Sequence, residues 1–174
     1  PFQPTKGQAE FFKKMDPFFS KKSEDKPVFI LKGYAGTGKT SLISALVKIL
    51  PRMEMRSLLL APTGRAAKVM SNYSGRGAFT IHKIIYKPKG DPGTMGGGFV
   101  LQKNYFKDTL FIIDESSMLA DDGGMSGNLL WDVITYVFSG AGNRLIFIGD
   151  TAQLPPVGST YSPALESGYL LRHY

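Results

Sequence analysis

The stretch "VFILKGYAGTGKTSLISALVKIL", residues 28–50, decides the fold. Its first four residues are apolar and predict a short buried strand, and its last ten place leucine and isoleucine side chains at helical spacing. Between them, residues 33–40 match the phosphate-binding P-loop pattern, with glycine, lysine and threonine at the required positions. The alternative is a glycine-rich turn with a purely structural role. A strand, this loop and a helix in succession predict a nucleotide-binding α/β domain.

Three further apolar segments repeat the pattern of a strand that ends in a polar loop. They are residues 57–60, 109–113 and 144–148, and helical patterns separate them along the chain. Short apolar strands between helices predict a mostly parallel sheet with helices on both faces. In such sheets ligands bind beyond the carboxyl ends of the strands. We therefore expect the four polar loops to meet at one edge of one sheet.

The remaining segments complete a single domain over residues 1–174. The capping-box spacing of Thr5 and Gln8 predicts a first helix, which Pro17 limits. Helices are also expected after Thr63, over residues 80–86 and over residues 128–138. Residues 87–108 form a basic, glycine-rich insertion in which 99–102 and 104–106 are expected to pair as a small hairpin. Residues 162–174 show no clear pattern of a final helix or strand.

Composition narrows the class of protein. The formal net charge is +7, which suits an anionic partner such as nucleic acid, although a soluble basic surface would give the same value. The absence of cysteine excludes disulfides and thiolate-bound zinc. No apolar run is long enough to cross a bilayer, and the N-terminus has no signal-peptide pattern. The expectation is a cytoplasmic protein without a membrane segment.

The P-loop predicts the ATP and Mg²⁺ contacts. Its glycines allow backbone N–H groups to turn inward around phosphate oxygens, at the positive end of the following helix. Lys39 is expected to reach the β- and γ-phosphates, and Thr40 to place its hydroxyl on Mg²⁺. The predicted nucleotide-binding residues here are Gly33, Ala35, Gly36, Thr37, Gly38, Lys39, Thr40 and Ser41.

Acids and an amide follow two other strands. Asp114 ends the strand at 109–113 and is predicted to hold Mg²⁺, usually through water. Glu115 is predicted to be the general base for an attacking water, which favours hydrolysis over transfer to a small molecule. Gln153, in the loop after residues 144–148, is expected to contact the γ-phosphate or that water. The alternative for Gln153 is an ordinary turn amide.

Five segments together carry a family resemblance. In chain order they are "GYAGTGKT", "APTGRAA", "TIHKIIY", "DESSM" and "GDTAQLPPVG", and they resemble motifs I, Ia, Ib, II and III of superfamily 1 helicases. The chain looks most like the 5′→3′ branch, with its RecD-like, Dda-like and Pif-like DNA helicases. The resemblance implies a P-loop NTPase RecA-like fold, with ATP and Mg²⁺ as cofactors. It also implies single-stranded DNA, and junctions of single- and double-stranded DNA, as partners.

The resemblance also implies roles for individual residues. Gln8 matches a glutamine that reads the adenine edge; its other possible role is the capping box with Thr5. The implied DNA-backbone contacts are Pro62, Thr63, Gly64, Arg65, Thr80 and His82. For His82 the alternative is a solvated histidine on a short helix. The aromatic residues Tyr73, Phe79 and Tyr86 fit either base stacking or the core, and core is the commoner role. Residues 88–107 match the place of a strand-separating hairpin in several relatives.

The family uses two RecA-like domains, and the second supplies motifs IV to VI with arginines for the γ-phosphate. No segment of residues 1–174 matches these motifs, so we expect a first motor domain without the second. Such a chain should bind ATP weakly, hydrolyse it slowly and not unwind DNA alone. The alternatives are a nucleotide-gated DNA-binding module and another P-loop ATPase, such as an AAA-type remodelling enzyme. A GTPase is disfavoured because no Asn-Lys-x-Asp segment is present.

Overall fold

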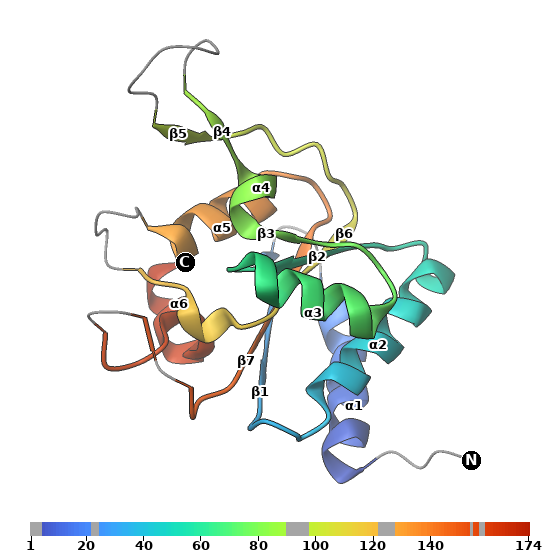
Figure 1. Ribbon diagram of the computed structural model, residues 1–174. Helices are drawn as coiled ribbons and strands as arrows, with labels where there is room; N and C mark the ends of the chain where they lie inside the picture. The colour runs from blue at the N-terminus through green and yellow to red at the C-terminus, as the bar shows by residue number, and fades with distance from the viewer. Residues whose placement is uncertain (1–4, 22–24, 90–97, 122–127, 154, 157–158) are drawn as a thin grey trace.

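The computed structural model describes residues 5–21, 25–89, 98–121, 128–153, 155–156 and 159–174. In these residues the main sheet has five strands, all of them parallel (Figure 1). Their order is β1 (Val28–Lys32), β7 (Arg144–Gly149), β6 (Thr109–Ile113), β2 (Arg56–Ala61) and β3 (Ala78–Thr80). The predicted α/β fold with a mostly parallel sheet is confirmed.

Helices cover both faces of this sheet, because side chains of each strand alternate between the faces. In β1, Phe29 and Leu31 join one apolar cluster, whereas Val28 and Ile30 join the other. The first cluster includes residues of α1 (Lys6–Ser20), α2 (Lys39–Ile49) and α3 (Gly64–Ser74). The second includes residues of α4 (Ile81–Ile85), α5 (Leu129–Phe138) and α6 (Ser167–His173). Figure 1 shows the two groups of helices on opposite sides of the strands. Short 3₁₀ helices are η2 (Leu50–Met53), η3 (Ser116–Met118) and η4 (Pro163–Leu165).

Strand β6 lies at the centre of the sheet, between β7 and β2. All five of its residues are buried, and its four apolar side chains are 0% exposed. Full burial of one such side chain is worth roughly 1.5–3 kcal/mol. The residue that follows this strand, Asp114, is therefore anchored to a fully buried central strand.

The expectation that Pro17 limits the first helix is wrong, because α1 continues through Pro17 to Ser20. A proline inside a helix costs about 3 kcal/mol through the lost hydrogen bond and a steric clash. The ring of Phe18, only 4% exposed, packs edge-on against Phe29 of β1, with centroids 5.7 Å apart. Burial of a side chain like Phe18 returns about 1.5–3 kcal/mol, enough to offset most of that cost.

The predicted pairing of residues 99–102 with 104–106 is wrong, because residues 99–101 pair with a different segment. Strand β4 (Tyr86–Pro88) pairs antiparallel with β5 (Phe99–Leu101), so 104–106 take no part; residues 90–97 lie outside the described residues. The side chain of Asn104 instead donates to the Tyr136 carbonyl of α5, at 2.7 Å. The nearby Phe106 ring packs on Phe111 of β6, with centroids 5.7 Å apart. Packing on the domain thus competes with the local pairing that the sequence suggested.

Strand β3 and the helices of the last segment have no counterpart in the prediction. Strand β3 is only three residues long, too short for a period-2 pattern to be visible. The segment 162–174, whose sequence shows no clear pattern of a final helix or strand, forms η4 and α6. Ala164, Leu165 and Leu170 in this segment are buried against the core, and their tertiary contacts stabilise these short helices.

Gly149, the last residue of β7, packs directly against a buried side chain. A Cβ placed there would lie 2.6 Å from one methyl of Leu165 and 2.8 Å from the other. Since Leu165 is only 1% exposed, we expect Gly149→Ala to destabilise the fold by about 1–3 kcal/mol through overpacking. Urea denaturation gives the free energy of unfolding.

The matched control is Gly7→Ala in α1, where nothing lies within 4 Å of the added Cβ. Alanine favours the helix over glycine, so Gly7→Ala should stabilise by up to about 1 kcal/mol. Equal effects of the two substitutions would contradict the packing described for Gly149.

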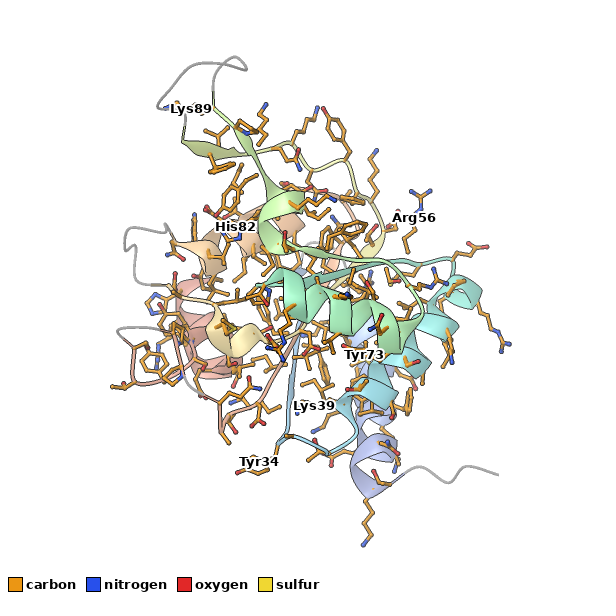
Figure 2. All side chains as sticks on the ribbon, in the orientation of Figure 1. Tyr34, Lys39, Arg56, Tyr73, His82 and Lys89 are labelled. Carbon is orange, nitrogen blue, oxygen red and sulfur yellow. The ribbon has the colours of Figure 1, made fainter. Side chains whose placement is uncertain are left out.

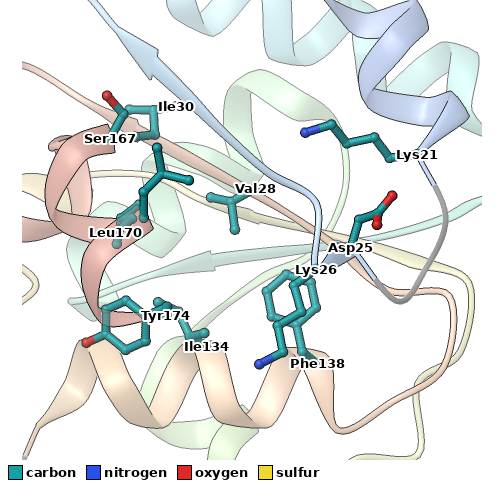
Figure 3. A pocket seen from close by; sticks show the side chains of 11 residues that line it. Lys21, Asp25, Lys26, Val28, Ile30, Ile134, Phe138, Ser167, Leu170 and Tyr174 are labelled. Atoms are coloured by element: carbon teal, nitrogen blue, oxygen red, sulfur yellow. The ribbon is translucent and has the colours of Figure 1, made fainter.

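A groove of about 500 Å³ lies beside β1, on the face of the sheet covered by α5 and α6 (Figure 3). Its apolar lining comes from Val28, Ile30, Ile134, Phe138, Leu170, Leu171 and Tyr174. None of the site residues predicted from the sequence lines it.

Within the described residues, no helix is both long and apolar enough to span a membrane.

Candidate active site

The loops that follow the five parallel strands lie along one edge of the sheet. In spatial order this edge carries the P-loop after β1, the loop of Gln153 after β7 and the Asp114–Glu115 pair after β6. The loop of Thr63 after β2 and the turn of Thr80 at β3 continue the same edge. The structure therefore brings the segments of the predicted site to one edge, as expected from a parallel sheet.

The P-loop joins β1 to α2 with a backbone that only glycine adopts easily. Gly36 and Gly38 have φ angles of 76° and 84°, in the left-handed region. A Cβ at Gly33 would lie 2.7 Å from Thr37 Oγ1. That hydroxyl donates to the Tyr34 carbonyl at 2.7 Å and closes the loop. Ala35 and Ser41 are exposed, as is Thr40 in the first turn of α2.

Lys39 lies against the P-loop itself. Its Nζ donates to the Gly33 carbonyl and, at 2.7 Å, to the Tyr34 carbonyl. Figure 2 shows Lys39 beside this loop, with Tyr34 at the tip of the connection between β1 and α2. The ammonium group is thus held where the loop closes, on two of the loop's own carbonyls.

Gln8 forms the predicted capping box. Gln8 N donates to Thr5 Oγ1 at 3.3 Å, and Thr5 N donates to Gln8 Oε1 at 2.9 Å. Gln8 also lies beside the P-loop, because a Cβ at Gly38 would be 3.1 Å from Gln8 Nε2. The side chain is only 8% exposed. The capping role is therefore observed, and the amide also lies beside the loop where a nucleotide would bind.

Asp114 has both carboxylate oxygens engaged. Its Oδ1 accepts from the backbone N–H of Glu115 at 2.9 Å, and its Oδ2 accepts from the hydroxyl of Tyr73 at 2.8 Å. Burial and the Asp114 charge raise the pKa of Tyr73 well above its usual value, so this hydroxyl is a donor at neutral pH. These contacts fix the orientation of the carboxylate at the end of β6.

Glu115 follows in a left-handed backbone conformation, with φ of 51°. Burial raises the pKa of Glu115, the neighbouring Asp114 charge raises it further, and Arg65 acts in the opposite direction. A raised carboxyl pKa suits a group that takes a proton from water. The influence of Arg65 also places this guanidinium within electrostatic reach of Glu115.

Gln153 lies beside the segment that follows Glu115. Its Oε1 accepts from the hydroxyl of Ser117 at 3.1 Å, which leaves the amide NH₂ as a free donor group in the hydrogen bonds of the described residues. Ser162 in turn donates to the Ser117 carbonyl at 3.1 Å. The loops after β6 and β7 are thus connected through Ser117, which is 0% exposed.

The predicted DNA contacts lie at the ends of β2 and β3, which pair through Ala61 and Thr80. Thr63 caps α3 by accepting from Ala66 N at 3.2 Å, and Thr80 caps α4 by accepting from Lys83 N at 3.3 Å. Gly64, Arg65 and His82 are exposed, and Pro62 is half-buried. The His82 ring contacts Tyr86, with centroids 5.3 Å apart (Figure 2 labels His82). The two threonines therefore fix the starts of the helices that present these residues.

Tyr73 and Ser117 contact the site but were not among the site residues predicted from the sequence. The sequence allows Tyr73 either to stack on bases or to pack in the core. In the structure its hydroxyl donates a hydrogen bond to Asp114, 41 residues away. Ser117 contacts Gln153 across 36 residues. No local pattern predicts a partner at such separations, so these two contacts needed the tertiary structure.

The oxygen ligands at this edge fit a magnesium ion. Mg²⁺ uses one or two protein oxygens and completes its shell with water and substrate phosphates. Asp114 offers a carboxylate at the end of β6, and Thr40 offers an exposed hydroxyl in the first turn of α2. No three histidine, aspartate or glutamate side chains gather as a metal cage in the part of the chain that the structure describes. A bound Mg²⁺ would therefore depend on phosphate and water for its other ligands.

A parallel sheet whose first strand leads through a glycine-rich loop into a helix defines the class of P-loop α/β domains. Comparison with known proteins narrows that class. A family model described as an AAA domain matches residues 20–159, and the chain belongs to this family.

Two of the similar proteins illustrate the relationship. The ATP-dependent RecD2 DNA helicase of Deinococcus radiodurans is 33% identical over 132 residues, which are 74% of this chain and 16% of that protein. The ATP-dependent DNA helicase dda of Enterobacteria phage T4 is 32% identical over 139 residues, which are 77% of this chain and 29% of that protein. The chain thus spans less than a third of the length of either relative.

A solved structure has the same fold. It is the crystal structure of Bacteroides sp Pif1 in complex with ADP-AlF4, with a TM-score of 0.56 and 21% sequence identity. The match covers 100% of this chain and 37% of that chain. Together with the sequence relatives, it confirms the predicted resemblance to the RecA-like motor domains of 5′→3′ superfamily 1 helicases.

Proposed function

We propose that this chain is the ATP-binding and ATP-hydrolysing motor domain of a DNA helicase. The order of loops along one sheet edge carries the proposal: predicted nucleotide loops follow β1, β7 and β6, and predicted DNA contacts follow β2 and β3. With neighbouring strands about 4.8 Å apart, the two ends of this edge are separated by about 19 Å. ATP and DNA thus bind neighbouring stretches of one sheet, where a shift of one loop can reach the other.

In the proposed ATP site, Lys39 exchanges the carbonyls of Gly33 and Tyr34 for the β- and γ-phosphates. The amide of Gln8 reads the adenine edge while its Oε1 keeps the cap of α1. Asp114 and Thr40 hold Mg²⁺, which supplies neutralisation of the phosphate charge. Glu115 accepts a proton from the attacking water. Gln153 offers its amide NH₂ to the γ-phosphate or to that water.

Names of the relatives support DNA as the polymer on which this domain acts, because RecD2 and dda are named ATP-dependent DNA helicases. They favour a helicase over an AAA-type remodelling enzyme. In the proposed DNA site, residues 62–65, Thr80 and His82 contact the backbone of a single strand. Binding of ATP and loss of the γ-phosphate would shift Gln153 and Ser117, and this shift would drive translocation and unwinding.

The hairpin of β4 and β5 projects away from the sheet beyond α4 (Figure 1), and Figure 2 places Lys89 on it. Phe99 on β5 is 72% exposed, and Tyr105 after it is 79% exposed. Exposed aromatic side chains among lysines suit contact with nucleic-acid bases and phosphates. We propose that this hairpin faces the junction of single- and double-stranded DNA.

Arg65 provides a test of the DNA site. Arg65→Ala should weaken binding of a fluorescent single-stranded oligonucleotide and reduce the slope of log affinity against log salt by about 0.7, the value for one phosphate contact. Fluorescence anisotropy at several salt concentrations measures the slope. Lys48→Ala, an exposed lysine at the end of α2, removes the same charge away from the proposed contacts. If the salt slopes of the two variants are equal, Arg65 contributes only its general positive charge and makes no specific phosphate contact.

Residues 1–174 alone should hydrolyse ATP slowly. In the related two-domain motors, arginines from motifs IV to VI meet the γ-phosphate, and an arginine of this kind is worth about 10³–10⁵ in rate in phosphoryl transfer. We propose that a second RecA-like domain supplies them in the complete motor. Nucleotide-dependent DNA binding without any turnover would instead favour a nucleotide-gated DNA-binding module.

A further inference from the structure

Tyr73 lies near the end of α3, and its side chain reaches the carboxylate that follows β6. The hydroxyl donates to Asp114 Oδ2 at 2.8 Å, across 41 residues of sequence. The ring packs beside the apolar cluster that α2 and α3 form over the sheet, and the residue is half-buried. Figure 2 labels Tyr73 on α3. The hydrogen bond therefore joins two elements that the core already holds in fixed positions.

The second oxygen of Asp114 is fixed independently. Asp114 Oδ1 accepts from the backbone N–H of Glu115 at 2.9 Å. Each carboxylate oxygen has two lone pairs, so both remain able to accept from a metal-bound water or to bind a cation. With one donor on each oxygen, the carboxylate plane has little freedom to rotate. Removal of the Tyr73 hydroxyl would leave the backbone N–H of Glu115 as its one remaining donor among the described residues.

We propose that Tyr73 is a positioning residue that orients Asp114 for the divalent cation bound with ATP. The proposal deepens the function proposed above and rests on Asp114 being the metal ligand. Donors that bond a ligating carboxylate fix its direction before the metal arrives, and their loss typically lowers metal affinity by 10–100-fold. Because Tyr73 bonds one oxygen of two, the lower end of this range is expected.

The test uses Tyr73→Phe, which keeps the ring and its packing and removes only the hydroxyl. Binding of Mn²⁺ is measured by electron paramagnetic resonance at saturating ADP, with Mn²⁺ as the probe. We expect the Mn²⁺ dissociation constant of Tyr73→Phe to rise about 10-fold. Excess Mn²⁺ should restore full occupancy, which an unfolded protein could not show. Affinity for ADP in the absence of divalent cation should stay within about 2-fold.

Tyr86→Phe is a matched control. The Tyr86 hydroxyl donates to Asp132 Oδ2 at 2.5 Å, so this variant also breaks a tyrosine–aspartate hydrogen bond, but away from the P-loop edge. Its Mn²⁺ dissociation constant should match that of the wild type. An equal loss of affinity in both variants would overturn the proposal, because it would trace the effect to general destabilisation.

Asp114→Asn separates this inference from the proposed function. If Asp114→Asn loses Mn²⁺ binding and Tyr73→Phe keeps the wild-type dissociation constant, the inference on Tyr73 fails and the ATP site stands. If the wild type shows no Mn²⁺ binding with ADP, or Asp114→Asn leaves that binding unchanged, the proposed metal site itself fails. Weaker, saturable Mn²⁺ binding in Tyr73→Phe alone supports the positioning role.

Discussion

Replacement of Lys39 by alanine should lower the affinity for ATP by about 10- to 150-fold, the equivalent of about 1.5–3 kcal/mol for a hydrogen bond to a charged group. The Lys39 ammonium already lies at the P-loop, on the carbonyls of Gly33 and Tyr34. In the ATP complex it would be the principal cation that the loop contributes to the β- and γ-phosphates. Isothermal titration with ATP and Mg²⁺ measures the dissociation constant.

Lys32→Ala is the matched control for Lys39→Ala. Lys32 is a lysine at the end of β1, beside the same loop, but its Nζ lies 2.9 Å from Glu166 Oε1 in an exposed ion pair. Removing it deletes the same charge near the same edge, so its effect on ATP affinity should stay within about 2-fold, the size of a surface-charge effect. If the two variants lose affinity equally, the P-loop lysine has no special contact with phosphate.

Replacement of Glu115 by glutamine should lower the rate of hydrolysis by about 10²–10⁴-fold while ATP binding is retained. Glutamine keeps the size of the side chain and cannot accept the proton from water. The raised pKa of Glu115, caused first by burial and then by the Asp114 charge, fits this role. Single-turnover assays with labelled ATP resolve rates that are too slow for steady-state methods.

A similar substitution outside the site controls for this result. Glu166→Gln removes an exposed carboxylate that pairs with Lys32, so its single-turnover rate should equal that of the wild type. A Glu115→Gln variant with weaker ATP binding and an unchanged rate constant would assign Glu115 to nucleotide binding and leave the general base unidentified.

The strands and the sheet edge could be predicted from the sequence because their signals are local. Short, mostly apolar runs such as residues 109–113 are typical of a strand buried on both faces, and β6 is that strand. The carboxyl ends of parallel strands share an edge, so the sequence alone predicts that the P-loop, Asp114 and Gln153 gather there. The helix expected after Thr63 is α3, and the Thr63 side chain caps its first turn.

Features that depend on tertiary packing could not be predicted from the sequence. Pro17 disfavours a helix locally, but burial of Phe18 against β1 extends α1 beyond it. Asn104 bonds the end of α5, which removes residues 104–106 from the hairpin. The contacts of Tyr73 with Asp114 and of Ser117 with Gln153 join segments far apart in the sequence. Each of these outcomes is decided by a partner that no short window of sequence contains.

The most direct test of the central claim is ATP turnover by this chain, measured with and without single-stranded DNA, for the wild type and Lys39→Ala. We expect slow turnover by the wild type in both conditions, and none by Lys39→Ala. Rapid turnover that DNA stimulates and Lys39→Ala abolishes would contradict the need for arginines from a second domain. Turnover that Lys39→Ala leaves unchanged would contradict the assignment of the P-loop edge as the site of ATP hydrolysis.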